Sequence, residues 1–194
     1  MQAVLDFFTG ESKNDMVKRV TETIVFMLDW CDREEIYTID GCLRVGGPHS
    51  SQIKKHISES VDAKIPQEFL QDDNDKMSII KACMKKLSCA KVIEFDQTCK
   101  IVFNETVDSE GKTQIDFKVQ NQVEMMIELF YVFVCKIIKH EATSQMNPLA
   151  VASVLSMMMF DDTGEATVAE ATKVQTRIPC IRDQLIELCK ETDL

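Results

Sequence analysis

The strongest constraint in the sequence is the apolar periodicity of residues 123–137. Apolar side chains recur there at steps of three and four, which places them along one stripe of an α-helix. Other apolar residues fall on the remaining sides of the same helix, and a helix that is apolar on several sides is usually buried. We therefore expect a central helix whose stripe is formed by Val123, Ile127, Phe130, Val134 and Ile137.

Other segments carry a single apolar stripe at helical spacing, which is typical of helices that surround a core. The first covers residues 15–31, and Ser12 or Asn14 would be its N-cap. A short helix is expected after Pro48, and a longer one is expected to begin near Asp75. These stripes predict a helical bundle.

The period changes between residues 92 and 119. β-Branched and aromatic residues alternate there with polar ones on both sides of the sequence DSEGK, which is typical of a hairpin. We expect strands near residues 100–107 and 113–119, and a third near residues 92–95. The fold class predicted from the sequence is therefore mostly α: a single helical-bundle domain over residues 1–194, with a small β-hairpin insertion at about 92–119.

The charge of the chain limits its partners. The formal net charge is −10 and the isoelectric point is about 4.8. Phosphate backbones and anionic membrane surfaces would be repelled, so we expect no nucleic-acid ligand. The longest apolar stretches are too short and too interrupted to span a bilayer, so we expect no direct membrane insertion.

The eight cysteines are scattered, and no CxxC motif or zinc-ligand spacing is present. No secretory segment precedes them. We interpret them as reduced thiols of a cytoplasmic protein, and we expect neither a metal nor a cofactor on this chain. A thiol-dependent enzyme remains an alternative that rests on the number of cysteines alone.

Three of the six glycines lie around one arginine, in the sequence DGCLRVGG. Glycines permit a tight turn, so Arg44 would project from a short loop while Leu43 and Val45 point inward as anchors. A structural alternative is that Arg44 pairs with a nearby acid such as Glu34 or Glu35.

The sequence DGCLRVGG resembles the G-[IL]-[FY]-R-x-[SG]-G signature of Rho-type GTPase-activating (RhoGAP) domains. Gly41, Leu43, Arg44 and Gly47 stand at the matching positions. Further matches follow in the same order. IIKACMKKLSCAKV resembles a helix of the family that carries a lysine and an arginine, whose positions fall on Lys81 and Lys85, and MNPLAVASVLSM resembles a later helix.

The chain departs from the family pattern at several places. The leucine-proline-proline signature is replaced by LSCAKV, and the expected hairpin has no place in the all-helical family core. The family's asparagine falls on Ala150, and the family's proline falls on Met157. Asn147 is the nearest candidate to replace the asparagine, although its position before Pro148 also fits a helix N-cap.

The resemblance implies an activator of GTP hydrolysis rather than an enzyme with its own active site. Arg44 would be inserted in trans into a Rho- or Rac-type small GTPase, with Lys81 and Lys85 supporting its loop or contacting the GTPase. GTP and magnesium would belong to the partner. The alternative within the same fold is a non-catalytic GTPase-binding or scaffold module, and nothing in the sequence indicates an oligomeric state.

Overall fold

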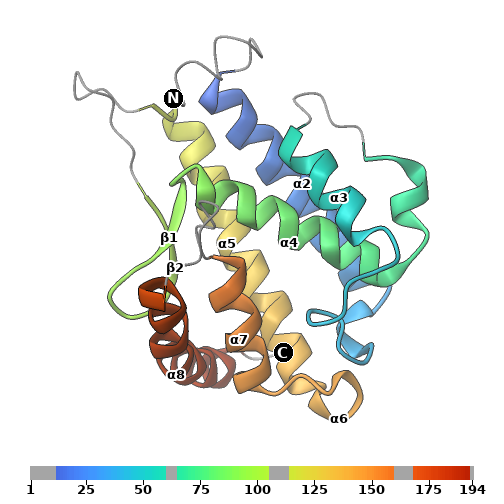
Figure 1. Ribbon diagram of the computed structural model, residues 1–194, viewed down its shortest axis with the longest axis vertical. Helices are drawn as coiled ribbons and strands as arrows, with labels where there is room; N and C mark the ends of the chain where they lie inside the picture. The colour runs from blue at the N-terminus through green and yellow to red at the C-terminus, as the bar shows by residue number, and fades with distance from the viewer. Residues whose placement is uncertain (1–11, 60–64, 105–113, 160–167, 193–194) are drawn as a thin grey trace.

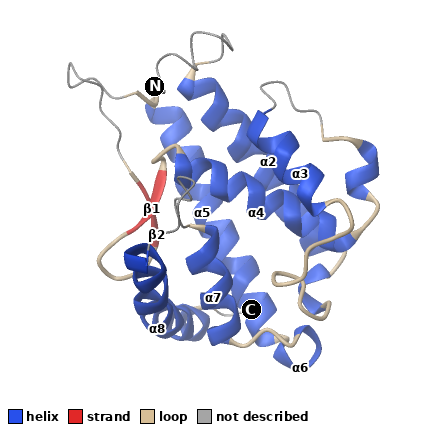
Figure 2. Cartoon of the chain, viewed as in Figure 1, coloured by secondary structure: helices blue, strands red, loops and turns tan. Residues whose placement is uncertain are grey.

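The computed structural model describes residues 12–59, 65–104, 114–159 and 168–192. Within these ranges the chain is mostly helical with one small antiparallel sheet, which confirms the predicted fold class (Figures 1 and 2). None of the described helices is both long and apolar enough to cross a membrane. The helices are α2 (Lys13–Arg33), α3 (Ser50–Glu59), α4 (Asp73–Cys89), α5 (Phe117–Lys139), α6 (Glu141–Ser144), α7 (Pro148–Met158) and α8 (Val168–Glu191), with short 3₁₀ turns η1 (Ile36–Thr38) and η2 (Gln67–Leu70).

Helix α2 packs against both α4 and α5 around the main core. In Figure 1, α4 (green) crosses in front of α2 (blue) and α5 (yellow), and α3 packs on α4. Helices α7 and α8 pack together beside the lower half of α5. All five residues of the predicted stripe are buried on α5, which confirms that helix: Val123, Ile127, Phe130, Val134 and Ile137.

The helix starts follow side-chain caps. Ser12 caps α2, because its hydroxyl oxygen accepts a hydrogen bond from the backbone N–H of Asp15 at 3.1 Å. Helix α4 was expected to begin near Asp75 with Asp75 as its N-cap, and that cap was wrong. The N-cap is Asp72, whose side-chain oxygen accepts hydrogen bonds from the backbone N–H groups of Asn74 and Asp75. Asp75 itself lies in the first turn and is fully buried. Several acids in a row can each cap a helix, and tertiary packing selects among them.

The hairpin is formed by the expected strands near residues 92–95 and 100–107, rather than by those near 100–107 and 113–119 (Figure 2). Strand β1 (Ile93–Phe95) pairs with β2 (Ile101–Phe103), with Glu94 opposite Val102. The strand expected over residues 113–119 was wrong, since α5 begins at Phe117. The pattern there is ambiguous because the buried residues 115, 119 and 123 also fit one face of a helix. A strand would bury Phe117 on the same face as residues 115 and 119, but Phe117 is 75% exposed. The sequence DSEGK falls outside the described residues.

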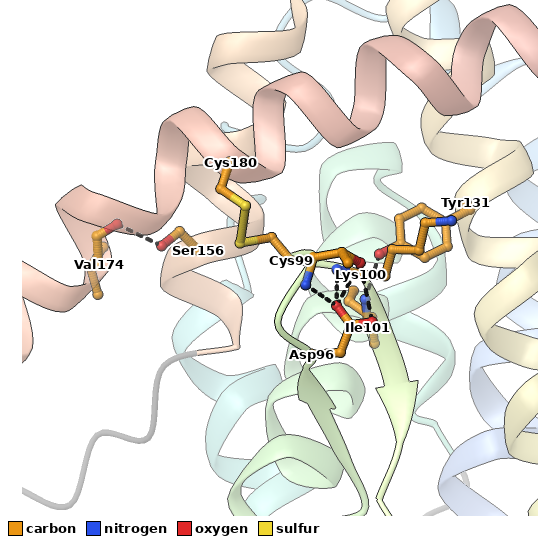
Figure 3. Close-up of a disulfide and its surroundings, with 9 residues drawn as sticks. Asp96, Cys99, Lys100, Ile101, Tyr131, Ser156, Val174 and Cys180 are labelled. Carbon is orange, nitrogen blue, oxygen red and sulfur yellow. Dashed lines mark hydrogen bonds between the residues drawn. A yellow bond between two sulfur atoms is a disulfide. The ribbon is translucent and has the colours of Figure 1, made fainter.

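The turn between the two strands is joined covalently to α8 (Figure 3). Cys99 in this turn forms a disulfide with Cys180, 81 residues further along the chain. The expectation that all cysteines are reduced thiols was therefore wrong for this pair. No sequence spacing marks it, because the fold brings together two elements that are distant in sequence. The backbone N–H of Ile101 also donates to the Tyr131 hydroxyl at 2.6 Å, which attaches the hairpin to α5.

Candidate functional site

The loop that carries Arg44 (residues 40–49, the Arg44 loop) turns tightly at Gly41. The backbone N–H groups of Arg44 and Val45 both donate to the Gly41 carbonyl at 2.7 Å. Gly41 has φ of +65°, a conformation that side chains rarely adopt, and a Cβ there would lie 2.8 Å from Val45 Cγ2. Glycine at this position is therefore required by both the backbone conformation and the close approach of a side chain.

The end of the Arg44 loop is packed directly against the start of α4. A Cβ on Gly47 would lie 2.2 Å from Oδ1 of Asp75, so only glycine fits there without movement of the helix. The Asp75 carboxylate is fully buried and accepts from the backbone N–H of His49 at 3.0 Å, while Nδ1 of His49 lies 2.8 Å from Oδ2. This buried carboxylate holds the loop at its C-terminal end.

Lys81 on α4 holds the middle of the Arg44 loop. Its Nζ donates to the carbonyl of Leu43 at 2.8 Å and to that of Val45 at 3.3 Å. These carbonyls belong to the two residues on either side of Arg44. Burial lowers the pKa of Lys81 below its ordinary value, and the nearby charge of Lys54 lowers it further.

A third contact comes from α6. The backbone N–H of Gly41 donates to the carbonyl of Ser144 at 2.7 Å. Ser144 is buried, and its hydroxyl donates to the carbonyl of Ile137 at 3.0 Å, so α6 is in turn fixed to the end of α5. The Arg44 loop is thus held by α4 on one side and by α6 on the other, and Figure 1 shows it between the start of α4 and α6.

The Arg44 side chain projects from this fixed backbone into solvent, with 57% of its surface exposed. It pairs with a nearby acid, as the structural alternative expected, but that acid is Asp40 rather than Glu34 or Glu35, and Nη2 of Arg44 lies 3.9 Å from Oδ1 of Asp40. An exposed pair at this distance contributes little to stability, so the guanidinium can leave Asp40 at a small cost. Leu43 is fully buried as expected, but the expectation for Val45 was wrong, because it is 43% exposed.

The remaining predicted residues lie on or next to the helices that hold the loop. Lys85 is half-buried one turn after Lys81 on α4. Asn147 follows Ser144 by three residues and caps α7, since its Oδ1 accepts from the backbone N–H of Ala150 at 2.9 Å. The side-chain carbonyl of Asn147 is therefore already engaged within the chain.

The sequence did not reveal two residues that hold the loop. Asp75 was interpreted as a helix cap, and Ser144 was not considered. Asp75 stands in an acidic run that resembles a solvated surface, and its burial depends on the packing of the loop against α4. Ser144 contributes a backbone carbonyl, which carries no residue-type signal.

Most of the free thiols in the described residues are poor nucleophiles. Burial raises the pKa of Cys31 and Cys83 to about 12 and that of Cys42 to about 11. Cys135 differs, because the Cys189 thiol donates to its sulfur at 2.9 Å and holds its pKa down to about 7. Among the described residues, no group of three or more His, Cys, Asp or Glu side chains is arranged to hold a metal ion.

Comparison with models of known protein families finds no match, and a search of curated proteins finds none either. The resemblance to RhoGAP domains therefore rests on the sequence matches alone.

Proposed function

We propose that this chain activates GTP hydrolysis by a Rho- or Rac-type small GTPase, and that Arg44 enters the partner's active site in trans. The observation that carries the proposal is the position of Lys81, whose ammonium group binds both carbonyls that flank an exposed arginine. This contact fixes the backbone on each side of Arg44 while the side chain stays exposed.

The chemistry of GTP hydrolysis explains why an arginine would be presented in this way. Negative charge develops on the transferring phosphoryl group and the leaving oxygen, so a cation delivered there stabilises the transition state more than the ground state. The planar guanidinium can contact two phosphate oxygens and keeps its charge when water is excluded. GTP and magnesium would be bound by the GTPase, which would also place this chain in the cytoplasm.

The three attachments of the loop reduce the cost of docking. Lys81 holds its middle, Ser144 holds its start and Asp75 holds its end. Little backbone entropy is therefore left to lose when a partner binds, and the geometry of the arginine is set in advance. Lys85 and Asn147 are proposed to lie at the border of the GTPase contact.

The test is single-turnover GTP hydrolysis by a panel of Rho, Rac and Ras-type GTPases. We expect the wild-type chain to accelerate hydrolysis. Arg44→Ala should lower the accelerated rate by a factor of about 10³–10⁵, the range typical of arginine fingers. Arg33→Ala is the matched control, because Arg33 is also exposed and also pairs with an aspartate four residues earlier. Equal activation by wild type and Arg44→Ala would refute the finger role.

The second candidate is a module that binds a GTPase without activating it. It is favoured by Ala150 at the position of the family's asparagine and by the engagement of Asn147 in the cap of α7. In this case a GTP-loaded GTPase would bind in a pull-down, while its hydrolysis stayed at the intrinsic rate. Accelerated hydrolysis would exclude this candidate.

A further inference from the structure

Helices α2 and α5 leave a groove between them that the Arg44 loop does not touch. The groove has a volume of about 620 Å³ and is lined by residues 21–32 of α2 and 122–136 of α5. Its apolar lining includes side chains that are unusually exposed: Phe26 is 55% exposed, Met125 50%, Leu129 41% and Val132 36%. At 1.5 Å per residue, the α2 side of the groove is about 16 Å long, which matches three turns of another helix.

The exposed residues of α5 form a second apolar stripe. Met125, Leu129 and Val132 follow one another at steps of four and three, on the side of the helix away from its core stripe. A stripe at this spacing is the kind of surface that receives a helix in a groove. Contiguous exposed apolar surface of this sort marks an interaction site more often than chance.

The charges at the groove are mostly negative. Three carboxylates line it, those of Glu22, Asp29 and Asp32, against the single cation Lys136. Lys136 is bound to Asp32 at 2.5 Å at one end of the groove, and Arg33, which does not line it, is bound to Asp29 at 2.8 Å. The lining carboxylates still outnumber the cations bound to them, so the potential along the groove favours a partner with positive charge.

The opposite end of the groove contains buried polar atoms without a partner. Oγ1 of Thr21 and Oε1 of Gln122 have no hydrogen bond to any described residue, and Thr21 is 1% exposed. The Gln122 amide oxygen can only accept. A lysine or arginine inserted at this end would be a suitable donor, because unpaired buried acceptors are costly.

We propose that the α2–α5 groove binds an amphipathic helix of a partner protein whose apolar stripe is flanked by lysine or arginine. A second copy of this chain is disfavoured, since two acidic grooves would face each other. The inference is independent of the proposed function, because no residue of the Arg44 loop lines the groove.

Two fluorescein-labelled synthetic peptides would test the proposal by anisotropy. They share one leucine stripe on an alanine background of about 18 residues, long enough for helix formation, and carry either lysine or glutamate at the flanking positions. We expect the full chain to bind the lysine peptide at least about tenfold more tightly, with the difference reduced at high salt. Leu129→Ser should weaken binding by about tenfold, and Glu22→Gln combined with Asp29→Asn should remove the preference for lysine.

Met157→Ser on α7 is the matched control, because Met157 is 69% exposed but does not line the groove. Arg44→Ala should bind the peptide as wild type does, which separates this inference from the proposed function. Equal affinity for both peptides, no binding of either, or no effect of Leu129→Ser would overturn the proposal. If the chain self-associates and Leu129→Ser abolishes the self-association, the groove binds a second copy instead. If the lysine peptide binds only after removal of residues 1–11, the groove is assigned to the chain's own N-terminus.

Discussion

Lys81 is the residue whose contacts distinguish the Arg44 loop from an ordinary turn. Replacing it with methionine keeps the length and the apolar stem but removes the donor to the Leu43 and Val45 carbonyls. If the proposed function holds, we expect Lys81→Met to lower GTPase activation by about 10–100-fold with Arg44 unchanged, because a misplaced catalytic group costs rate in this range. Single-turnover hydrolysis measures the effect.

The matched control for this variant is Lys86→Met on the same helix. Lys86 also donates to a backbone carbonyl, that of Ile57 on α3, at 2.6 Å. Both substitutions should lower the free energy of unfolding by about 1–3 kcal/mol, the contribution of a hydrogen bond from a charged group. Only Lys81→Met should lose activation, and an equal loss with Lys86→Met would attribute the effect to general destabilisation of α4.

The tight turn of the loop could be predicted from the sequence because three of the chain's six glycines lie around Arg44. Gly41 and Gly47 occupy positions where the structure has no room for a Cβ. The contacts that hold the loop were less visible. Asp75 was assigned to the wrong role, since the sequence does not show which acid of a cluster becomes buried. Val45 was expected to be buried, and a single apolar residue in a turn gives no periodicity from which to judge.

At the scale of elements, α5 and α8 carry a second close pair of cysteines. The Cys189 thiol donates to Cys135 at 2.9 Å, which lowers the pKa of Cys135 to about 7 from its ordinary value of 9.0 and raises that of Cys189. The thiolate of Cys135 is therefore present above about pH 7. We expect glutathione disulfide to oxidise this pair to a disulfide. The Cys135 thiolate attacks glutathione disulfide, which forms a mixed disulfide and releases one glutathione. Cys189 then displaces the second glutathione from Cys135, so that two glutathione thiols are released for each disulfide formed.

The rate of this linkage should rise with pH and level off above about pH 7, whereas an unperturbed thiol would continue to gain reactivity up to about pH 9. Mass spectrometry after quenching with acid measures it. In Cys189→Ser, peptide mapping should find glutathione on Cys135 in place of the link, while Cys31 and Cys83, whose pKa is raised to about 12, should remain unmodified. A rate that keeps rising to pH 9 would contradict the lowered pKa of Cys135.

The helices were easier to predict than the strands because their apolar period extends over many turns. The stripe of α5 repeats over residues 123–137, and a strand pattern cannot imitate it at that length. Over residues 113–119 only a few positions carry the signal, and the same apolar residues fit either period. The β-hairpin was therefore placed in the right region but with one wrong strand.

At the scale of the whole molecule, α8 is held by a covalent bond and a hydrogen bond in addition to its apolar packing. The Cys99–Cys180 disulfide attaches it to the turn of the hairpin, and Ser156 on α7 donates to the carbonyl of Val174 at 3.1 Å (Figure 3). Disulfides are uncommon in a reducing cytoplasm, where the proposed GTPase partner would be met. The redox state of this one bond therefore affects how firmly the C-terminal helix is held.

Reduction of Cys99–Cys180 should lower the free energy of unfolding by about 2–4 kcal/mol, because the bond closes a loop of 81 residues in the unfolded chain. Alkylation of the unreduced protein and mass analysis first establish that the bond is present. Guanidinium unfolding with and without dithiothreitol then measures the difference in the free energy of unfolding. Cys180→Ala should match the reduced wild type and show no further loss with dithiothreitol. If reductant destabilises Cys180→Ala as much as wild type, another cysteine pair carries the effect. If neither changes, the packing of α8 on α7 and α5 holds it without a contribution from the disulfide.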